Sequence, residues 1–144
     1  FQEAAITMLG SNKENDKAIY KFAAVLGLTL ASALIITAIT PLSKLWFSKV
    51  SGLSAELTGL ALTPLLIMGL FPASTVLISM QRAILVKDGQ TSPITNATII
   101  EVLTIISVLY ISIIHLSAVG VVAAASAFLS GRLAANTYLY FKTR

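Results

Sequence analysis

The chain has 144 residues, of which 56% are hydrophobic and 11% are charged. Soluble domains contain about 45–50% apolar and about 25% charged residues, so this composition predicts a membrane protein. The absence of cysteine excludes disulfides and thiolate metal sites. The net charge of +4 is scattered and forms no basic stripe with interleaved aromatic residues, so we expect no nucleic-acid partner.

The opening residues, Phe1 to Gly10, read as the tail of a preceding segment, because they lack the basic leader and cleavage site of a secretory signal. We therefore expect the chain to be a fragment of a longer protein. Its length allows about four membrane spans of about 20 apolar residues each. Residues 11–17 are polar and predict a solvated linker, with Asp16 as a cap for the helix that follows.

The first predicted span covers about residues 18–40 and ends before Pro41, since proline rarely continues a helix. Residues 41–52 place two lysines around Leu45-Trp46-Phe47, a mixture typical of the headgroup layer of a membrane. We interpret this segment as a loop with one aromatic anchor. A short interfacial helix is the alternative.

The second predicted span, about 53–86, is longer than one crossing requires and contains Pro64 and Pro72. An interior proline removes a backbone hydrogen bond, so the helix should kink at these residues. Structural bending is one interpretation, and a hinge that moves during a working cycle is the other. The span ends near Gln81 and Arg82, before a polar turn.

Two further spans, about 93–115 and 118–141, are predicted to form a hairpin with a bend at Leu116-Ser117-Ala118. The fourth is rich in small residues, which allow close helix packing in lipid, so we expect protein to surround it. These residues are Gly120, Ala123, Ala124, Ala125, Ser126, Ala127, Ser130, Gly131, Ala134 and Ala135.

Each helix of this hairpin carries one ionisable residue in its apolar run, Glu101 in the third span and Arg132 in the fourth. If the helices are antiparallel, both residues lie roughly 12–14 Å from the same membrane face, at about 1.5 Å of rise per residue. The sequence therefore predicts that the two side chains pair, with Arg82 close to them in depth. Charges inside a membrane normally face protein or a wet cavity. The pair could lock two helices together, or it could serve the passage of a substrate or ion.

Lysine and arginine in the short connections favour cytoplasmic termini, with seven such residues on the predicted cytoplasmic side and two on the other. Paired catalytic carboxylates, a Ser-His-Asp set, metal-ligand spacings and a glycine-rich phosphate loop are all missing from the sequence. We therefore expect a protein that is not an enzyme and that has no cofactor and no metal site.

The succession of these features resembles a known family. A small-residue segment, Ala4-Ala5-Ile6, precedes a polar linker and the span that stops at Pro41. The segment with Leu45-Trp46-Phe47 leads into the long proline-bearing helix, which ends at Gln81-Arg82-Ala83, and a tight hairpin closes the chain. In this order the features resemble the C-terminal part of the multidrug/oligosaccharidyl-lipid/polysaccharide exporter superfamily. The stretch from Leu70-Phe71-Pro72 to Ser92-Pro93 is also similar to its progressive ankylosis protein branch.

The resemblance covers almost the whole chain and implies the end of the eighth helix and the ninth to twelfth helices of such a protein. It implies two six-helix lobes that alternate access to a central cavity, coupled in many members to a sodium or proton gradient. The implied partners are the lipid bilayer, a missing N-terminal lobe, and a small-molecule or lipid-linked substrate. No motif places the cation-site acids of the family on Glu101 or Glu56.

The expected fold is an all-α, multi-pass transmembrane bundle in which residues 1–144 form a single unit with four spans, located in the cell membrane. The expected function is part of a secondary exporter or flippase. Substrate or ion pathway residues would be Glu101, Arg132, Arg82 and Gln81, with Pro64 and Pro72 as helix hinges. The alternative is a non-transporting four-helix assembly or scaffold subunit whose small-residue helix docks a partner.

Overall fold

The structure, a computed structural model, describes residues 2–8, 13–115 and 119–143, and within them every secondary-structure element is a helix. The all-α prediction is confirmed. In chain order the helices are α1 (Gln2–Met8), α2 (Lys13–Ile39), α3 (Pro41–Leu45), the π-helix η1 (Trp46–Val50), α4 (Ala55–Met68), α5 (Phe71–Lys87), α6 (Ser92–Ile114) and α7 (Gly120–Lys142).

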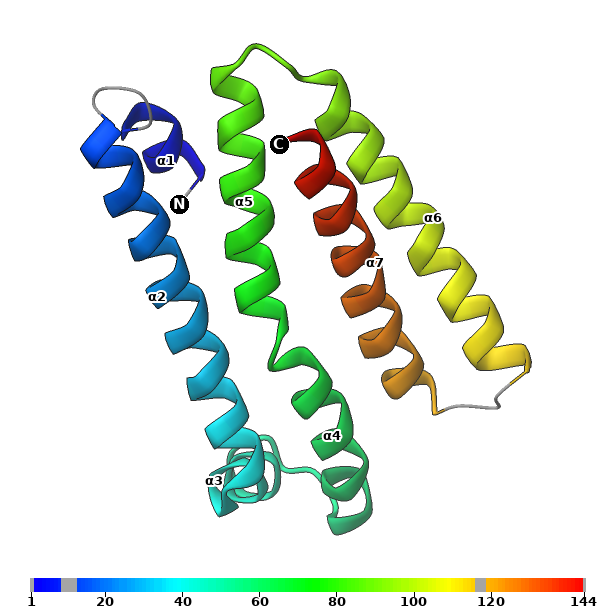
Figure 1. Cartoon of the computed structure of the whole chain (residues 1–144). Coiled ribbons are helices and arrows are strands. Elements are labelled where there is room, and N and C mark those ends of the chain that lie inside the picture. Colours follow the sequence, from blue (N-terminus) through cyan, green and yellow to red (C-terminus); the bar gives the residue numbers. More distant parts are fainter. Residues whose placement is uncertain (1, 9–12, 116–118, 144) are drawn as a thin grey trace.

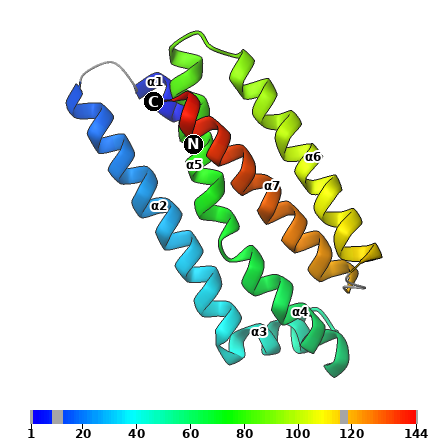
Figure 2. The same ribbon diagram turned by 45° about the vertical axis from the view of Figure 1, so that its right-hand side comes forward.

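The long helices run side by side, with α7 placed between α5 and α6 (Figures 1 and 2). The spatial order is therefore α2, then α4 with α5, then α7, then α6, which differs from the order in the chain. The last described turn of α7, the short helix α1 and the start of α2 all lie at the same end of the bundle (Figure 1). The last turn of α6 and the first turn of α7 are at the opposite end (Figure 1), and the predicted bend at 116–118 lies outside the described residues.

Within the described residues, three helical segments are long and apolar enough to cross a membrane: Lys17–Ile39, Ala55–Lys87 and Ser92–Ile114. The fourth predicted span, α7, has the same length as α6 but is less apolar, because small residues, Arg132 and Asn136 occupy much of it. Its position between α5 and α6 explains this composition, since small side chains let a helix pack closely against two neighbours.

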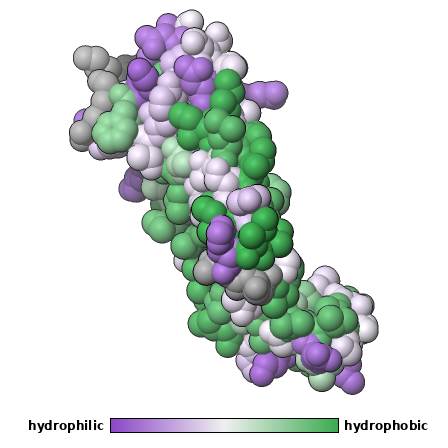
Figure 3. Space-filling view, turned by 90° about the vertical axis from the view of Figure 1, so that its right-hand side faces the viewer, coloured by the Kyte–Doolittle hydropathy of each residue, from purple (hydrophilic) through white to green (hydrophobic). Residues whose placement is uncertain are grey.

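The outer helices carry the large apolar side chains. On α6, residues such as Val102, Leu103, Ile106 and Ile113 are exposed. Figure 3 looks onto the α6 side and shows hydrophobic side chains over much of this face, with hydrophilic ones at the two ends of the view and a smaller hydrophilic patch near its middle. This distribution fits a helix that faces acyl chains or further apolar protein.

Two predicted boundaries are wrong. The predicted linker at 11–17 is helical from Lys13 onward, so Asp16 lies inside α2 rather than before its first turn. The predicted loop at 41–52 contains α3 and η1, as the alternative interpretation proposed. Pro41 starts α3 because its missing N–H is no loss in a first turn. The buried hydroxyl of Ser43 ties this segment to α2 by donating to the carbonyl oxygen of Ala38 at 3.2 Å.

The long proline-bearing segment breaks between α4 and α5, at Gly69 and Leu70. Pro72 is in the first turn of α5 and has no N–H to continue the hydrogen bonding of α4. Pro64, by contrast, is buried inside α4, which continues through it. A Cβ atom on Gly69 would lie 2.8 Å from Cγ1 of Ile35, so glycine lets α2 approach the break closely. Whether this break moves, as the hinge interpretation requires, stays a prediction.

Candidate functional site

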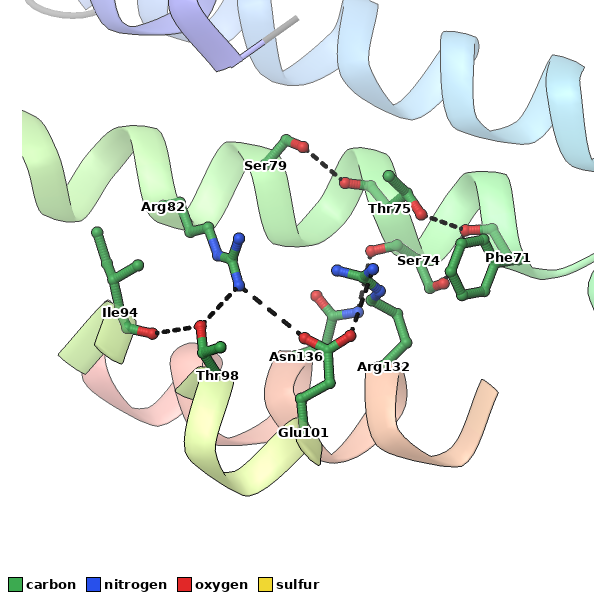
Figure 4. Close-up of polar contacts among 10 residues, drawn as sticks. All are labelled: Phe71, Ser74, Thr75, Ser79, Arg82, Ile94, Thr98, Glu101, Arg132 and Asn136. Atoms are coloured by element: carbon green, nitrogen blue, oxygen red, sulfur yellow. Dashed lines mark hydrogen bonds and ion pairs between the residues drawn. The ribbon is translucent and has the colours of Figure 1, made fainter. Parts of the chain in front are cut away.

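Glu101 of α6 lies between two arginines that come from two other helices (Figure 4). Its Oε1 is 3.3 Å from Nη2 of Arg132 on α7, and its Oε2 is 4.0 Å from Nη2 of Arg82 on α5. The side chains of Glu101, Arg132 and Arg82 are 13%, 20% and 23% exposed. The predicted pair of Glu101 and Arg132 is confirmed, and Arg82 joins it. We call these three residues the charge cluster.

Close packing of α6 and α7 holds the pair together. Gly131 is buried next to Arg132, and a Cβ atom there would lie 2.6 Å from Cγ1 of Ile105 and 2.9 Å from the main-chain oxygen of Glu101. Ala127 and Ala135, one turn away on either side, have no exposed surface. The small residues of α7 therefore let its backbone approach α6 at the level of the charge cluster, as predicted for this face, whereas Phe128 and Leu133 leave another face of α7 exposed.

Both guanidinium groups have further neighbours. Nη2 of Arg82 donates to Oγ1 of Thr98 at 3.3 Å, and Thr98 in turn donates to the carbonyl oxygen of Ile94. The guanidinium carbon of Arg132 lies 5.1 Å from the ring centre of Phe71, the first residue of α5, in a cation–π contact. The Nε atoms of both arginines are buried and have no hydrogen-bond partner among the described residues.

The charge cluster holds two guanidinium groups and one carboxylate, so it carries a formal net charge of +1. It lies where α5 and α6 both pack on α7, while α5 and α6 touch each other only slightly. The side chains of Thr75 and Ser79 on α5 and of Thr98 on α6 add hydroxyl groups on this side (Figure 4). Such an arrangement can bind an anion or lock the three helices together.

Gln81 lies outside the charge cluster, although it precedes Arg82 in the chain. Its Nε2 donates to the main-chain oxygen of Asn136 at 3.1 Å, and Nδ2 of Asn136 donates to the carbonyl oxygen of Ser74 at 3.0 Å. Both amide side chains are buried, and their oxygens have no partner among the described residues. The sequence analysis missed Asn136. The available signal was an amide one turn after Arg132, within a predicted span.

The two hinge candidates differ in their relation to the charge cluster. Pro72 follows Phe71, whose ring lies against Arg132, so the helix break is next to the cluster. Pro64 lies about two turns earlier, inside α4. The structure therefore brings Pro72 close to the charged residues and leaves Pro64 apart from them.

The described part of the chain offers no group of three or more His, Asp or Glu residues that could hold a metal ion. The chemistry available at the charge cluster is therefore ion pairing and hydrogen bonding. Comparisons with known proteins found no matching family model, no matching curated protein and no matching solved structure.

Proposed function

We propose that this chain is part of one lobe of a secondary exporter or flippase, which moves an organic or lipid-linked substrate across the membrane by alternating access. The observation that supports the proposal most is the charge cluster, in which three helices of an apolar bundle each contribute an ionised side chain. Charged side chains within transmembrane segments are costly and typically mark pathways for substrates, ions or protons.

The depth of the cluster strengthens this argument if α7 is a fourth span. Glu101 is nine residues from the start of α6, and Arg132 is ten residues from the end of α7. Both lie about 14–15 Å from the same end of the bundle, close to the centre of a hydrocarbon core about 30 Å thick. A buried ion pair is often no more stable than an apolar replacement, so helix packing alone gives little reason for three charges at this depth.

The excess positive charge indicates what the cluster does in the proposed cycle. One carboxylate cannot neutralise two guanidinium groups, and each arginine has a buried Nε without a partner among the described residues. A second anionic group, such as the head of a substrate, would satisfy both arginines. The contact of Arg132 with Phe71 would link such binding to the break between α4 and α5, where Pro72 allows bending.

The arrangement of basic residues favours an orientation with cytoplasmic termini in the cell membrane. Lys17, Lys21, Lys87 and Lys142 are near the end of the bundle that holds α1, whereas Lys44 and Lys49 are near the other end. Positively charged connections tend to stay in the cytoplasm. In this orientation the charge cluster would be reached from the cytoplasmic half of the membrane, and a sodium or proton gradient would drive the cycle.

The alternative function, a scaffold subunit that docks a partner on its small-residue helix, has less support. Half of the small residues that such docking would use are already buried within this chain, namely Ala123, Ala125, Ala127, Gly131 and Ala135. Gly131 in particular is in close contact with α6. A partner would find little of this surface free.

Transport by the full-length protein in proteoliposomes tests the proposal. The probes are a fluorescent organic dye and a fluorescent lipid-linked sugar, each measured under an imposed sodium or proton gradient. We expect wild-type protein to move at least one probe, and Glu101→Gln and Arg132→Gln to slow it at least tenfold. Arg132→Lys should keep part of the rate, because it keeps the charge but loses the forked donor geometry.

Glu56→Gln is the matched control, because Glu56 is an exposed carboxylate at the start of α4. Its transport rate should equal that of the wild type. Wild-type rates in both cluster variants, or no movement of either probe under either gradient, would refute the proposed role.

A further inference from the structure

A second feature of the bundle, separate from the charge cluster, is a cavity of about 490 Å³ between α2 and α5 near the C-terminal end of α7. Its α2 wall is made largely of small residues, Ala23, Ala24 and Gly27, and its α5 wall includes Val76 and Met80. The volume is within the range of small-molecule sites, about 300–1,000 Å³. The mainly apolar lining suits an apolar molecule.

One polar side chain on this wall is buried and has an acceptor oxygen without a partner among the described residues. Gln81 is only 5% exposed, and its Oε1 accepts no hydrogen bond from the described residues. The direction of this amide is determined by Asn136, whose main-chain oxygen can only accept and therefore faces Nε2 of Gln81. This acceptor has less than 1 Å² of exposed surface, so a donor in the cavity reaches it by displacing neighbouring side chains of the wall.

From this geometry we infer that the cavity binds a neutral lipid that carries a hydroxyl group, such as a sterol or a diacylglycerol, and that the hydroxyl donates to Oε1 of Gln81. The described lining residues include no carboxylate to balance an ammonium ion and no lysine or arginine to balance an acid. An acyl chain without a hydroxyl would leave the buried Oε1 of Gln81 without a hydrogen bond, which is unfavourable in free energy. A hydroxyl group that donates to this oxygen removes that penalty.

This inference does not depend on the proposed transport function. Successive residues of a helix point about 100° apart, so Gln81 faces the cavity between α2 and α5 while Arg82 reaches Glu101 on α6. A lipid in this cavity would contact α2 and α5 without touching the charge cluster.

Photolabelling of the full-length protein in lipid nanodiscs tests this assignment. The probes are a diazirine derivative of decan-1-ol and the methyl ether of the same compound, which has no donor. We expect the alcohol to label residues of α2 and α5 that line the cavity. The ether should label them about tenfold less, because it leaves the acceptor of Gln81 unpaired.

Two variants separate binding from folding. Ala24→Phe fills the cavity from α2 without changing Gln81 and should reduce alcohol labelling to the level of the ether. Ala33→Phe is the matched control, because Ala33 is also exposed on α2 but does not line the cavity, and its labelling should equal that of wild type. Gln81→Leu should make the alcohol and the ether label equally. Equal labelling by the two probes in wild type, unchanged labelling in Ala24→Phe, or labelling confined to other helices would overturn the inference.

Discussion

Glu101→Gln should be the most destabilising change in the charge cluster, because Glu101 is its only acid. At an effective dielectric constant of about 20, its attractions to Arg132 at 3.3 Å and Arg82 at 4.0 Å are worth about 5 and about 4 kcal/mol before desolvation is subtracted. Removing one partner of a buried pair typically costs about 3–5 kcal/mol. We expect about 3 kcal/mol, the lower end, because both arginine side chains remain about one fifth exposed.

The matched change on the basic side should behave differently. Arg82→Gln leaves Glu101 paired with Arg132 and brings the formal charge of the cluster to zero, so it should cost about 1 kcal/mol or less. The charge of the cluster, rather than the number of its contacts, determines this asymmetry.

The free energy of unfolding of the full-length protein, measured by dodecyl sulfate titration in mixed micelles with circular dichroism as readout, checks both values. Glu56→Gln serves as the control and should match wild type, since Glu56 is exposed. The reasoning is refuted if Glu101→Gln costs less than about 1 kcal/mol, or if Arg82→Gln costs as much as Glu101→Gln.

Three further predictions concern packing, the buried amides and the membrane surface. Gly131→Ala should lower the free energy of unfolding by about 1–3 kcal/mol in the same titration, because the new Cβ atom would lie 2.6 Å from Ile105 and force α6 and α7 apart. An unchanged free energy would mean that the two helices are not this close. Asn136→Ala should cost about 1–2 kcal/mol by removing the hydrogen bond to Ser74, and a neutral result would contradict that bond. The fluorescence of Trp46 is obtained as the difference between the emission of wild type and that of Trp46→Phe. Lipids brominated near the headgroup should quench it more strongly than lipids brominated deep in the acyl chain, because Trp46 is exposed on η1. Stronger quenching by the deep label would exclude an interfacial position.

The pair of Glu101 and Arg132 could be predicted because depth along a helix is a simple count of residues. Two antiparallel neighbours that share an end place such residues at one level, and the cost of a charge in lipid favours contact. The burial of α7 could be predicted for a related reason, since alanine and glycine leave little side chain to face lipid. A count of residues could not show that Arg82 reaches Glu101, because this contact depends on the rotation of α5 about its own axis and on its tilt toward α6.

Other features could not be predicted because they depend on the packing of distant segments. Gln81 and Asn136 are 55 residues apart, and only the position of α7 next to α5 brings them together. The sequence predicted kinks at both Pro64 and Pro72, whereas the structure breaks the helix at Gly69 and Leu70, just before Pro72. The structure distinguishes them, since Pro64 fits inside a continuing helix while Pro72 starts a new one.

Three local properties of the sequence determined that this is an all-helical chain with membrane-length helices and a paired acid and base. They are the composition, the length of the apolar runs and the spacing of the charges. They could do so because each depends on residues of one helix or one hairpin. The tertiary structure alone decided that α7 lies between α5 and α6, that a second arginine gives the cluster its excess positive charge, and that a cavity forms beside Gln81. These features arise from how the side-chain shapes of several helices fit together, and the order of residues along one helix does not specify which neighbour it meets.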